Sequence, residues 1–120
     1  MAEQGSNYTV RLAATPADVR AAQALRYAVF VRELGGGGDM VDHEAGLEQD
    51  HFDAHSDHLL LTDSRSGDVV GVYRLMRHDH AQAAGRFYSA SEYDLTPLLA
   101  SGRRLLELGR SCVDERYRTR

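Results

Sequence analysis

The chain has 120 residues, of which 42% are hydrophobic and 27% charged, and its formal net charge is −4 at pH 7. This composition is that of one globular domain over residues 1–120, and it excludes both an intrinsically disordered chain and a bilayer-spanning helix, because no apolar run is long enough. The single Cys112 excludes an internal disulfide, and residues 1–8 lack the layout of a secretion signal, so we expect a cytoplasmic protein.

A strand and a long helix are predicted first in chain order. Apolar and polar residues alternate from Tyr8 to Ala13, which is typical of a strand. Thr15-Pro16-Ala17-Asp18 then supplies a helix start, with an N-cap hydroxyl, a proline in the first turn and an acid three residues on. Apolar residues recur at helical spacing as far as Leu34, and the glycines at 35–38 end the helix in a mobile loop.

The rest of the chain predicts strands joined by polar segments. Residues 39–57 are polar and acidic and predict a loop with one helical turn. His58–Thr62 and Val69–Met76 flank a turn-rich connection, which is typical of an antiparallel hairpin. The further predicted elements are a strand-like Phe87-Tyr88, a short helix at Leu95–Ala100 and a strand at Leu105–Val113. One helix and four strands leave one sheet face uncovered, so we expect the C-terminal portion of the fold to be missing.

Charge is distributed unevenly along the chain. Acidic residues dominate from Asp39 to Asp68, arginines dominate from Arg103 to Arg120, and lysine is absent. The acidic segment could line a pocket for a cationic substrate. The arginine-rich segment could form a basic ledge that binds a phosphate-bearing substrate, because the planar guanidinium group matches the geometry of phosphate. Biased amino-acid usage with solvated faces explains the same pattern. The negative net charge and the scarcity of aromatic residues in the basic segment argue against a nucleic-acid partner.

Two pairs of residues in the first half of the chain are candidates for a site. Arg26 and Phe30 share a face at helical spacing, which places an arginine beside the apolar stripe, where it could equally snorkel at the edge of the core. Asp50 and Asp53 would meet in a helical turn. Two adjacent carboxylates could hold a cationic amine or could simply be solvated.

Charged residues also interrupt two of the predicted strands. Arg74 lies in the second strand of the hairpin, and Glu107-Leu108-Gly109-Arg110 lies in the last strand. Alternation predicts Glu107 and Gly109 on one face of the sheet and Leu108 and Arg110 on the other. An unpaired buried charge is very costly, so we expect these residues to form a polar network that threads the sheet.

Two other kinds of site are disfavoured. The histidines spaced for a metal site lack a His-Glu-x-x-His motif and paired cysteines, so we expect no metal; they are His51, His55, His58, His78 and His80. Cys112 is more typical of a small packed residue than of a nucleophile, although Arg110 nearby could lower its pKa.

In this order and spacing, the charged motifs resemble the acyl-carrier-protein-dependent branch of the GNAT acyltransferase superfamily, from about Tyr8 to Arg120. The segment Leu106-Glu-Leu-Gly-Arg-Ser-Cys-Val113 is most similar to the L-ornithine N-acyltransferases of ornithine-lipid synthesis. The acyl-homoserine-lactone synthases are the alternative. They rank second because they typically carry a tryptophan in the early loop, and this chain has none. A second alternative is a truncated, inactive fragment or binding module. The resemblance implies an α/β (α+β) fold with a mixed, mostly antiparallel sheet and flanking helices.

The resemblance also implies a reaction and a donor. A (3-hydroxy)acyl group would pass from the phosphopantetheine thioester of an acyl carrier protein to the amine of an amino acid, with ornithine favoured, and no bound cofactor is implied. The segment Arg116-Tyr-Arg-Thr-Arg120 lacks the glycines of the signature common in the superfamily, which favours acyl carrier protein over acyl-CoA. A peripheral membrane contact and self-association through an exposed sheet edge are left open as further partners.

Each matched residue receives an implied role. Glu107 would be the general base for the attacking amine, with Arg110 as its catalytic partner. The residues implied in acceptor binding are Arg26, Phe30, Asp50, Asp53 and Arg74, the two aspartates as a clamp for a cationic amine. The residues implied in donor binding, through backbone N–H groups and a basic ledge, are Ser111, Cys112, Val113, Arg116, Arg118 and Arg120.

Overall fold

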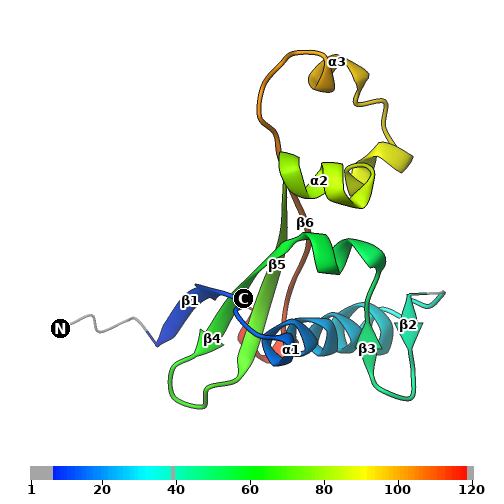
Figure 1. Ribbon diagram of the computed structural model, residues 1–120. Helices are drawn as coiled ribbons and strands as arrows, with labels where there is room; N and C mark the ends of the chain where they lie inside the picture. Colours follow the sequence, from blue (N-terminus) through cyan, green and yellow to red (C-terminus); the bar gives the residue numbers. More distant parts are fainter. Residues whose placement is uncertain (1–6, 39, 119–120) are drawn as a thin grey trace.

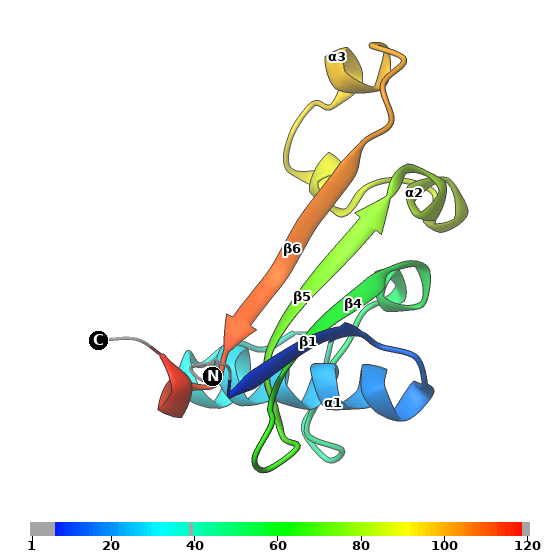
Figure 2. The same ribbon diagram turned by 90° about the vertical axis from the view of Figure 1, so that its left-hand side faces the viewer.

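The computed structural model describes residues 7–38 and 40–118, with a four-stranded antiparallel sheet at its centre (Figures 1 and 2). Its strands lie in the order β1 (Tyr8–Leu12), β4 (Asp57–Asp63), β5 (Val69–Arg77) and β6 (Leu106–Val113). All four were predicted within one or two residues of these bounds. Within the described residues, no helix combines the length and apolar character needed to span a membrane.

The predicted helix is confirmed, and it changes type along its length. Helix α1 (Pro16–Arg26) begins where the Thr15 hydroxyl accepts a hydrogen bond from the Asp18 N–H at 3.1 Å. It runs directly into a π-helix, η1 (Tyr27–Glu33), whose wider turn is seen where the N–H of residue 34 donates to the carbonyl of Val29, five residues earlier. The sequence pattern did not predict this widening.

The main hydrophobic core lies between this helix and one face of the sheet. Alternation along the strands points Leu60, Val72 and Cys112 toward α1, and the helix contributes Ala22, Leu25 and Val29. On the opposite face, apolar side chains of the two edge strands remain exposed, among them Val10 (61%) and Leu108 (53%). The sequence-based expectation of an uncovered sheet face therefore holds for the described residues.

The segment between the helix and β4 is more ordered than predicted. It forms a hairpin of β2 (Val41–Asp42) and β3 (Leu47–Glu48), followed by a 3₁₀ helix, η2 (His51–His55). Asp50 and Asp53 cap η2 reciprocally: the Asp50 side chain accepts from the Phe52 N–H, and the Asp53 side chain accepts from the Asp50 N–H. The predicted loop with one helical turn was thus right about the turn and wrong about the hairpin.

A second lobe connects β5 to β6 and stands at one end of the sheet (Figure 1). It contains α2 (His78–Ala84), η3 (Tyr88–Ser91) and α3 (Thr96–Leu99). Helix α2 was not predicted, and the strand-like assignment of residues 87–88 was wrong. Tyr88 begins a 3₁₀ helix instead, because the N–H groups of Tyr88 and Ser89 donate to the Glu107 carboxylate rather than to a neighbouring strand. A last 3₁₀ turn, η4 (Glu115–Tyr117), follows β6.

Strand β6 carries a β-bulge that changes the direction of Arg110. Val72 pairs with Cys112 but Arg74 pairs with Gly109, so two residues of β6 lie opposite the single residue 73. Arg110 has a φ of 47°, which is uncommon for a residue other than glycine. The predicted alternation was therefore wrong for Arg110, which lies on the helix side with its guanidinium 4.5 Å above the Phe30 ring.

Candidate functional site

A buried ion-pair network fills the space between α1, the β2–β3 hairpin and the sheet. Its first member is Arg26, which is 1% exposed. Arg26 Nε donates to Glu48 Oε1 at 2.8 Å, and Arg26 Nη2 donates to Asp53 Oδ2 at 2.6 Å and to the Glu48 carbonyl at 2.7 Å. Arg26 is therefore fixed by two segments that follow it in the chain, and the alternative of a snorkelling arginine is excluded.

Asp53 joins this arginine to a second one on the sheet. Arg74 Nη1 donates to Asp53 Oδ1 at 3.0 Å and to Asp50 Oδ1 at 2.7 Å, and Gln23 Nε2 donates to Asp53 Oδ2 at 3.0 Å. Burial raises the pKa of Asp53, but hydrogen bonds and charge from Arg26, with hydrogen bonds from Gln23 and Arg74, outweigh it and hold the pKa below its usual value. Asp53 is therefore an ionised buried group with partners on several sides.

Arg110 completes the network through Glu48, with which it forms an ion pair. Three arginines then face three carboxylates, so the buried charges balance; the acids are Glu48, Asp50 and Asp53. Among the described residues, the buried side-chain atom without a hydrogen-bond partner is Arg26 Nη1. The network thus has spare donor capacity and almost no unpaired negative charge.

The predicted acceptor-binding residues do come together, with one member that the sequence analysis missed. Glu48 was counted only as one of many acids in a predicted loop, yet it links Arg26 to Arg110. A signal was present: Val41-Asp42 and Leu47-Glu48 repeat an apolar-acidic pair around Gly46, whose φ of 69° suits a hairpin turn. The aspartates accept from protein donors, and their role as a clamp for a cationic amine stays a prediction.

Glu107 lies beside the network and is held by η3. The Tyr88 N–H donates to Glu107 Oε1 and the Ser89 N–H to Glu107 Oε2, both at 2.8 Å, and the Ser89 hydroxyl also contacts Oε2. An ionised carboxylate has about four acceptor positions, so three donors leave room for one further hydrogen bond. Glu107 is therefore held in one orientation and can still accept a hydrogen bond from a ligand.

A cavity of about 180 Å³ joins Glu107 to the network. Its polar lining comes from Glu107, Arg74 and Arg110, and Arg74 lies 5.2 Å from the centre of the Tyr88 ring. The remaining lining residues are Met76, Ser89, Leu108 and Gly109. The cavity thus places one carboxylate and two guanidinium groups on the same small volume, an arrangement that suits a zwitterionic ligand.

The predicted donor-binding residues are more dispersed. Ser111 is exposed and Val113 half-buried, and the side chain of Cys112 lies in the core. Arg116 pairs with Asp114 at 2.9 Å, and Arg118 Nη2 donates to Glu33 Oε1 at 2.7 Å. Both guanidinium groups of the predicted basic ledge therefore have acidic partners, and Arg120 lies outside the described residues.

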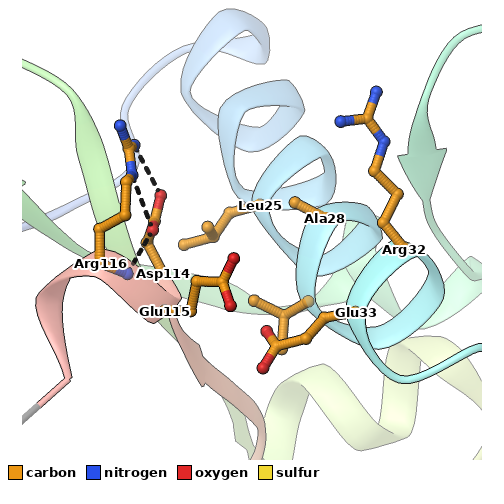
Figure 3. A pocket seen from close by; sticks show the side chains of 8 residues that line it. Leu25, Ala28, Arg32, Glu33, Asp114, Glu115 and Arg116 are labelled. Carbon is orange, nitrogen blue, oxygen red and sulfur yellow. Dashed lines mark hydrogen bonds and ion pairs between the residues drawn. The ribbon is translucent and has the colours of Figure 1, made fainter.

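The Arg116–Asp114 pair borders a second cavity, of about 380 Å³, between η1 and η4 (Figure 3). Figure 3 shows Arg116 directed at Asp114, with the carboxylates of Glu33 and Glu115 nearby. Acidic and basic groups are mixed around this volume, so it lacks the uniform positive charge of an anion site. The donor-binding role of this region stays a prediction.

Cys112 is expected to be unreactive in the native protein. Burial raises its pKa to about 11, against the opposing effect of Arg26, Arg110 and Arg118. Because the thiolate is the reactive form, labelling with a disulfide reagent at pH 8 should be slower in the native protein than in urea by about 100-fold or more. Equal rates in both conditions would contradict this burial.

The histidines considered as metal ligands lie in separate places. His58 Nε2 is 3.0 Å from the Asp53 carbonyl, and His51 stacks on Phe52 with ring centres 4.0 Å apart. Over residues 7–38 and 40–118, no three side chains of the metal-binding types lie close enough to hold an ion.

Comparison with known proteins points to one family. A model described as the acetyltransferase (GNAT) domain matches residues 25–120. The L-ornithine N(alpha)-acyltransferase of Rhodobacter capsulatus is 55% identical over 98% of this chain and 48% of its own length, and that of Rhizobium meliloti is 47% identical over 96% and 41%. The chain thus spans about half the length, or less, of these curated relatives.

Two solved structures share the fold. A putative N-acetyltransferase from Lactobacillus plantarum superposes with a TM-score of 0.52 at 23% identity, covering 94% of this chain and 57% of that one. The AHL synthase LasI superposes with a TM-score of 0.58 at 20% identity, covering 92% and 55%. At these identities the likeness concerns the fold alone.

Proposed function

The chain belongs to the acetyltransferase (GNAT) domain family, and from this we propose that it is part of an N-acyltransferase that acts on the amine of ornithine. The relatives named L-ornithine N(alpha)-acyltransferase support this acceptor, because they align over nearly the whole chain. We further propose that the acyl donor is a thioester on the phosphopantetheine of an acyl carrier protein. The product would be an N-acylated ornithine, as in lyso-ornithine lipid synthesis.

The observation that carries the proposal is the cavity that brings Glu107 together with Arg74 and Arg110. An amino acid fits such a cavity when its carboxylate faces the guanidinium groups, which bind carboxylates bidentately. Its amine would then face Glu107, whose remaining acceptor position can take the proton directly or through a water molecule. The buried carboxylates Asp50 and Glu48 form ion pairs with these two arginines and hold them in place.

In the proposed reaction, the deprotonated amine nitrogen attacks the thioester carbonyl carbon. Before this attack Glu107 takes one proton from the ammonium group of ornithine; a C–N bond then forms, the C–S bond breaks, and a second proton from the nitrogen passes to the leaving thiolate, which departs as the carrier thiol. The bulge at residues 110–111 interrupts the β5–β6 ladder beside the cavity. Backbone N–H groups released from such a ladder can stabilise the developing oxyanion.

The test is an assay with purified protein, 3-hydroxyacyl-acyl carrier protein and L-ornithine. We expect ornithine-dependent release of the carrier thiol and an N-acylornithine detected by mass spectrometry, with the matching acyl-CoA much less active. Other basic and neutral amino acids serve as acceptor controls. Absence of thioester consumption with ornithine from either donor would overturn the proposal, and an equal rate with every amino acid would overturn the assignment of ornithine.

A further inference from the structure

We propose that an apolar hollow in the α2–α3 lobe binds the hydrocarbon chain of the acyl group. This inference rests on the proposed function, and it assigns that function a subsite for an aliphatic chain. The hollow has a volume of about 170 Å³, and its apolar lining is Phe87, Leu95, Leu98, Leu105 and Leu106.

The hollow adjoins the proposed reaction centre. Ser89 and Glu107 line it, and the same two residues line the polar cavity that also contains Arg74 and Arg110. A single molecule can therefore occupy both volumes, with its polar head in the cavity, its aliphatic tail in the hollow and Glu107 beside the point where the two meet. Together the two volumes reach the lower end of the range of small-molecule pockets, about 300–1,000 Å³.

The hollow has a packed floor and an exposed rim. Phe87 is 5% exposed and belongs to the cluster of Phe52, Met76 and Ala81, against which Leu95 and Leu105 also lie. In contrast, Leu98 is 53% exposed and Leu106 56% exposed. Covering such side chains with a hydrocarbon chain removes apolar surface from water, which is favourable in proportion to the area buried.

The size of the hollow and its position distinguish an acyl chain from a protein partner. A stable protein interface covers about 800 Å² on each side, whereas this hollow is a small depression that shares Ser89 and Glu107 with the neighbouring cavity. Because each buried methylene contributes about fourfold in affinity, even a short stretch of chain would affect the choice of donor.

The test compares Leu98→Trp with the wild type and with Leu99→Trp. Tryptophan at residue 98 fills the hollow, whereas residue 99 lies on the same helix, is 47% exposed and does not line it. We expect Leu98→Trp to lower kcat/KM for hexadecanoyl-acyl carrier protein about tenfold or more and to leave kcat/KM for the hexanoyl donor within about twofold. Leu99→Trp should keep the wild-type ratio of the two donors.

Each outcome separates the subsite from the function. If Leu98→Trp is active and its ratio of kcat/KM for the two donors equals that of the wild type, the subsite is overturned and the proposed function stands. The same holds if Leu98→Trp changes the mass of the protein in solution but not this ratio. If no donor reacts with the wild type, the proposed function fails. Calorimetry with N-hexadecanoyl-ornithine then decides the subsite alone: weaker binding to Leu98→Trp than to Leu99→Trp supports it, and equal binding or no binding to the wild type overturns it.

Discussion

Replacing Glu107 with alanine is expected to lower kcat for acyl transfer by about 10²- to 10⁴-fold, the range that a positioned general base contributes. The physical reason is that Glu107 is the carboxylate on the cavity that also presents Arg74 and Arg110. The measurement is steady-state release of the carrier thiol, with circular dichroism to show that the variant is folded. Unchanged kcat would contradict the role assigned to Glu107.

A structural effect must be separated from the chemical one, because Glu107 also anchors η3 through its hydrogen bonds from residues 88 and 89. Ser89→Ala is the matched control, since it removes the hydroxyl contact and leaves the carboxylate in place. We expect it to reduce kcat by less than about tenfold. Glu107→Gln keeps the size of the side chain but cannot take a proton, so it should lose kcat as Glu107→Ala does, whereas Ser89→Ala should retain most of it.

Replacing Asp53 with alanine is expected to lower the free energy of unfolding by about 3–5 kcal/mol, the usual cost of breaking a buried ion pair. Asp53 is 6% exposed and forms ion pairs with both Arg26 and Arg74. Its removal leaves the three arginines of the network with two carboxylates, those of Glu48 and Asp50. The measurement is urea denaturation at pH 7. Asp79→Ala is the control, because Asp79 forms a long, exposed ion pair of 3.9 Å with Arg77, and its removal should cost about 1 kcal/mol or less.

The pH dependence of stability gives an independent check on Asp53. Its pKa is lowered in the folded protein, so the ionised carboxylate stabilises the native state above the unfolded value of about 3.9 and loses this effect as the pH falls through the folded pKa. Asn at this position does not titrate. The difference in unfolding free energy between wild type and Asp53→Asn should therefore shrink as the pH falls below about 4, and a constant difference would contradict the assignment.

Local sequence patterns were sufficient for much of the fold. Strand alternation and the Thr15 cap act over a few residues, so β1, β4, β5, β6 and the start of α1 could be predicted. The wider turn of η1 and the bulge at Arg110 could not, because helical periodicity and strand alternation describe regular elements and both features are local departures from them. Helix α2 was missed because the polar residues of His78–Ala84 show no clear apolar stripe, and Ala81 alone is buried there.

The site shows the same division between local and distant information. The requirement that a buried charge has a partner was enough to predict that Arg74 and Arg110 belong to a polar network. Arg26 was assigned to the site only by the family resemblance, because its helical pattern alone left a snorkelling side chain open. Which acid pairs with which arginine was not predictable, because Glu48 enters through a hairpin of two-residue strands. Likewise, nothing near Glu107 in the sequence indicates that the N–H groups of η3 orient it.

The ion-pair network also constrains the order in which the chain can fold. Arg26 and Asp53 are 27 residues apart and Arg74 and Asp50 are 24, and Arg110 joins Glu48 from the last strand. Until β5 and β6 have joined the sheet, the carboxylates of Glu48, Asp50 and Asp53 lack two of their three arginine partners, Arg74 and Arg110. These acids must stay hydrated until then, so docking of the β2–β3 hairpin is expected to be a late folding event, limited by non-local loop closure.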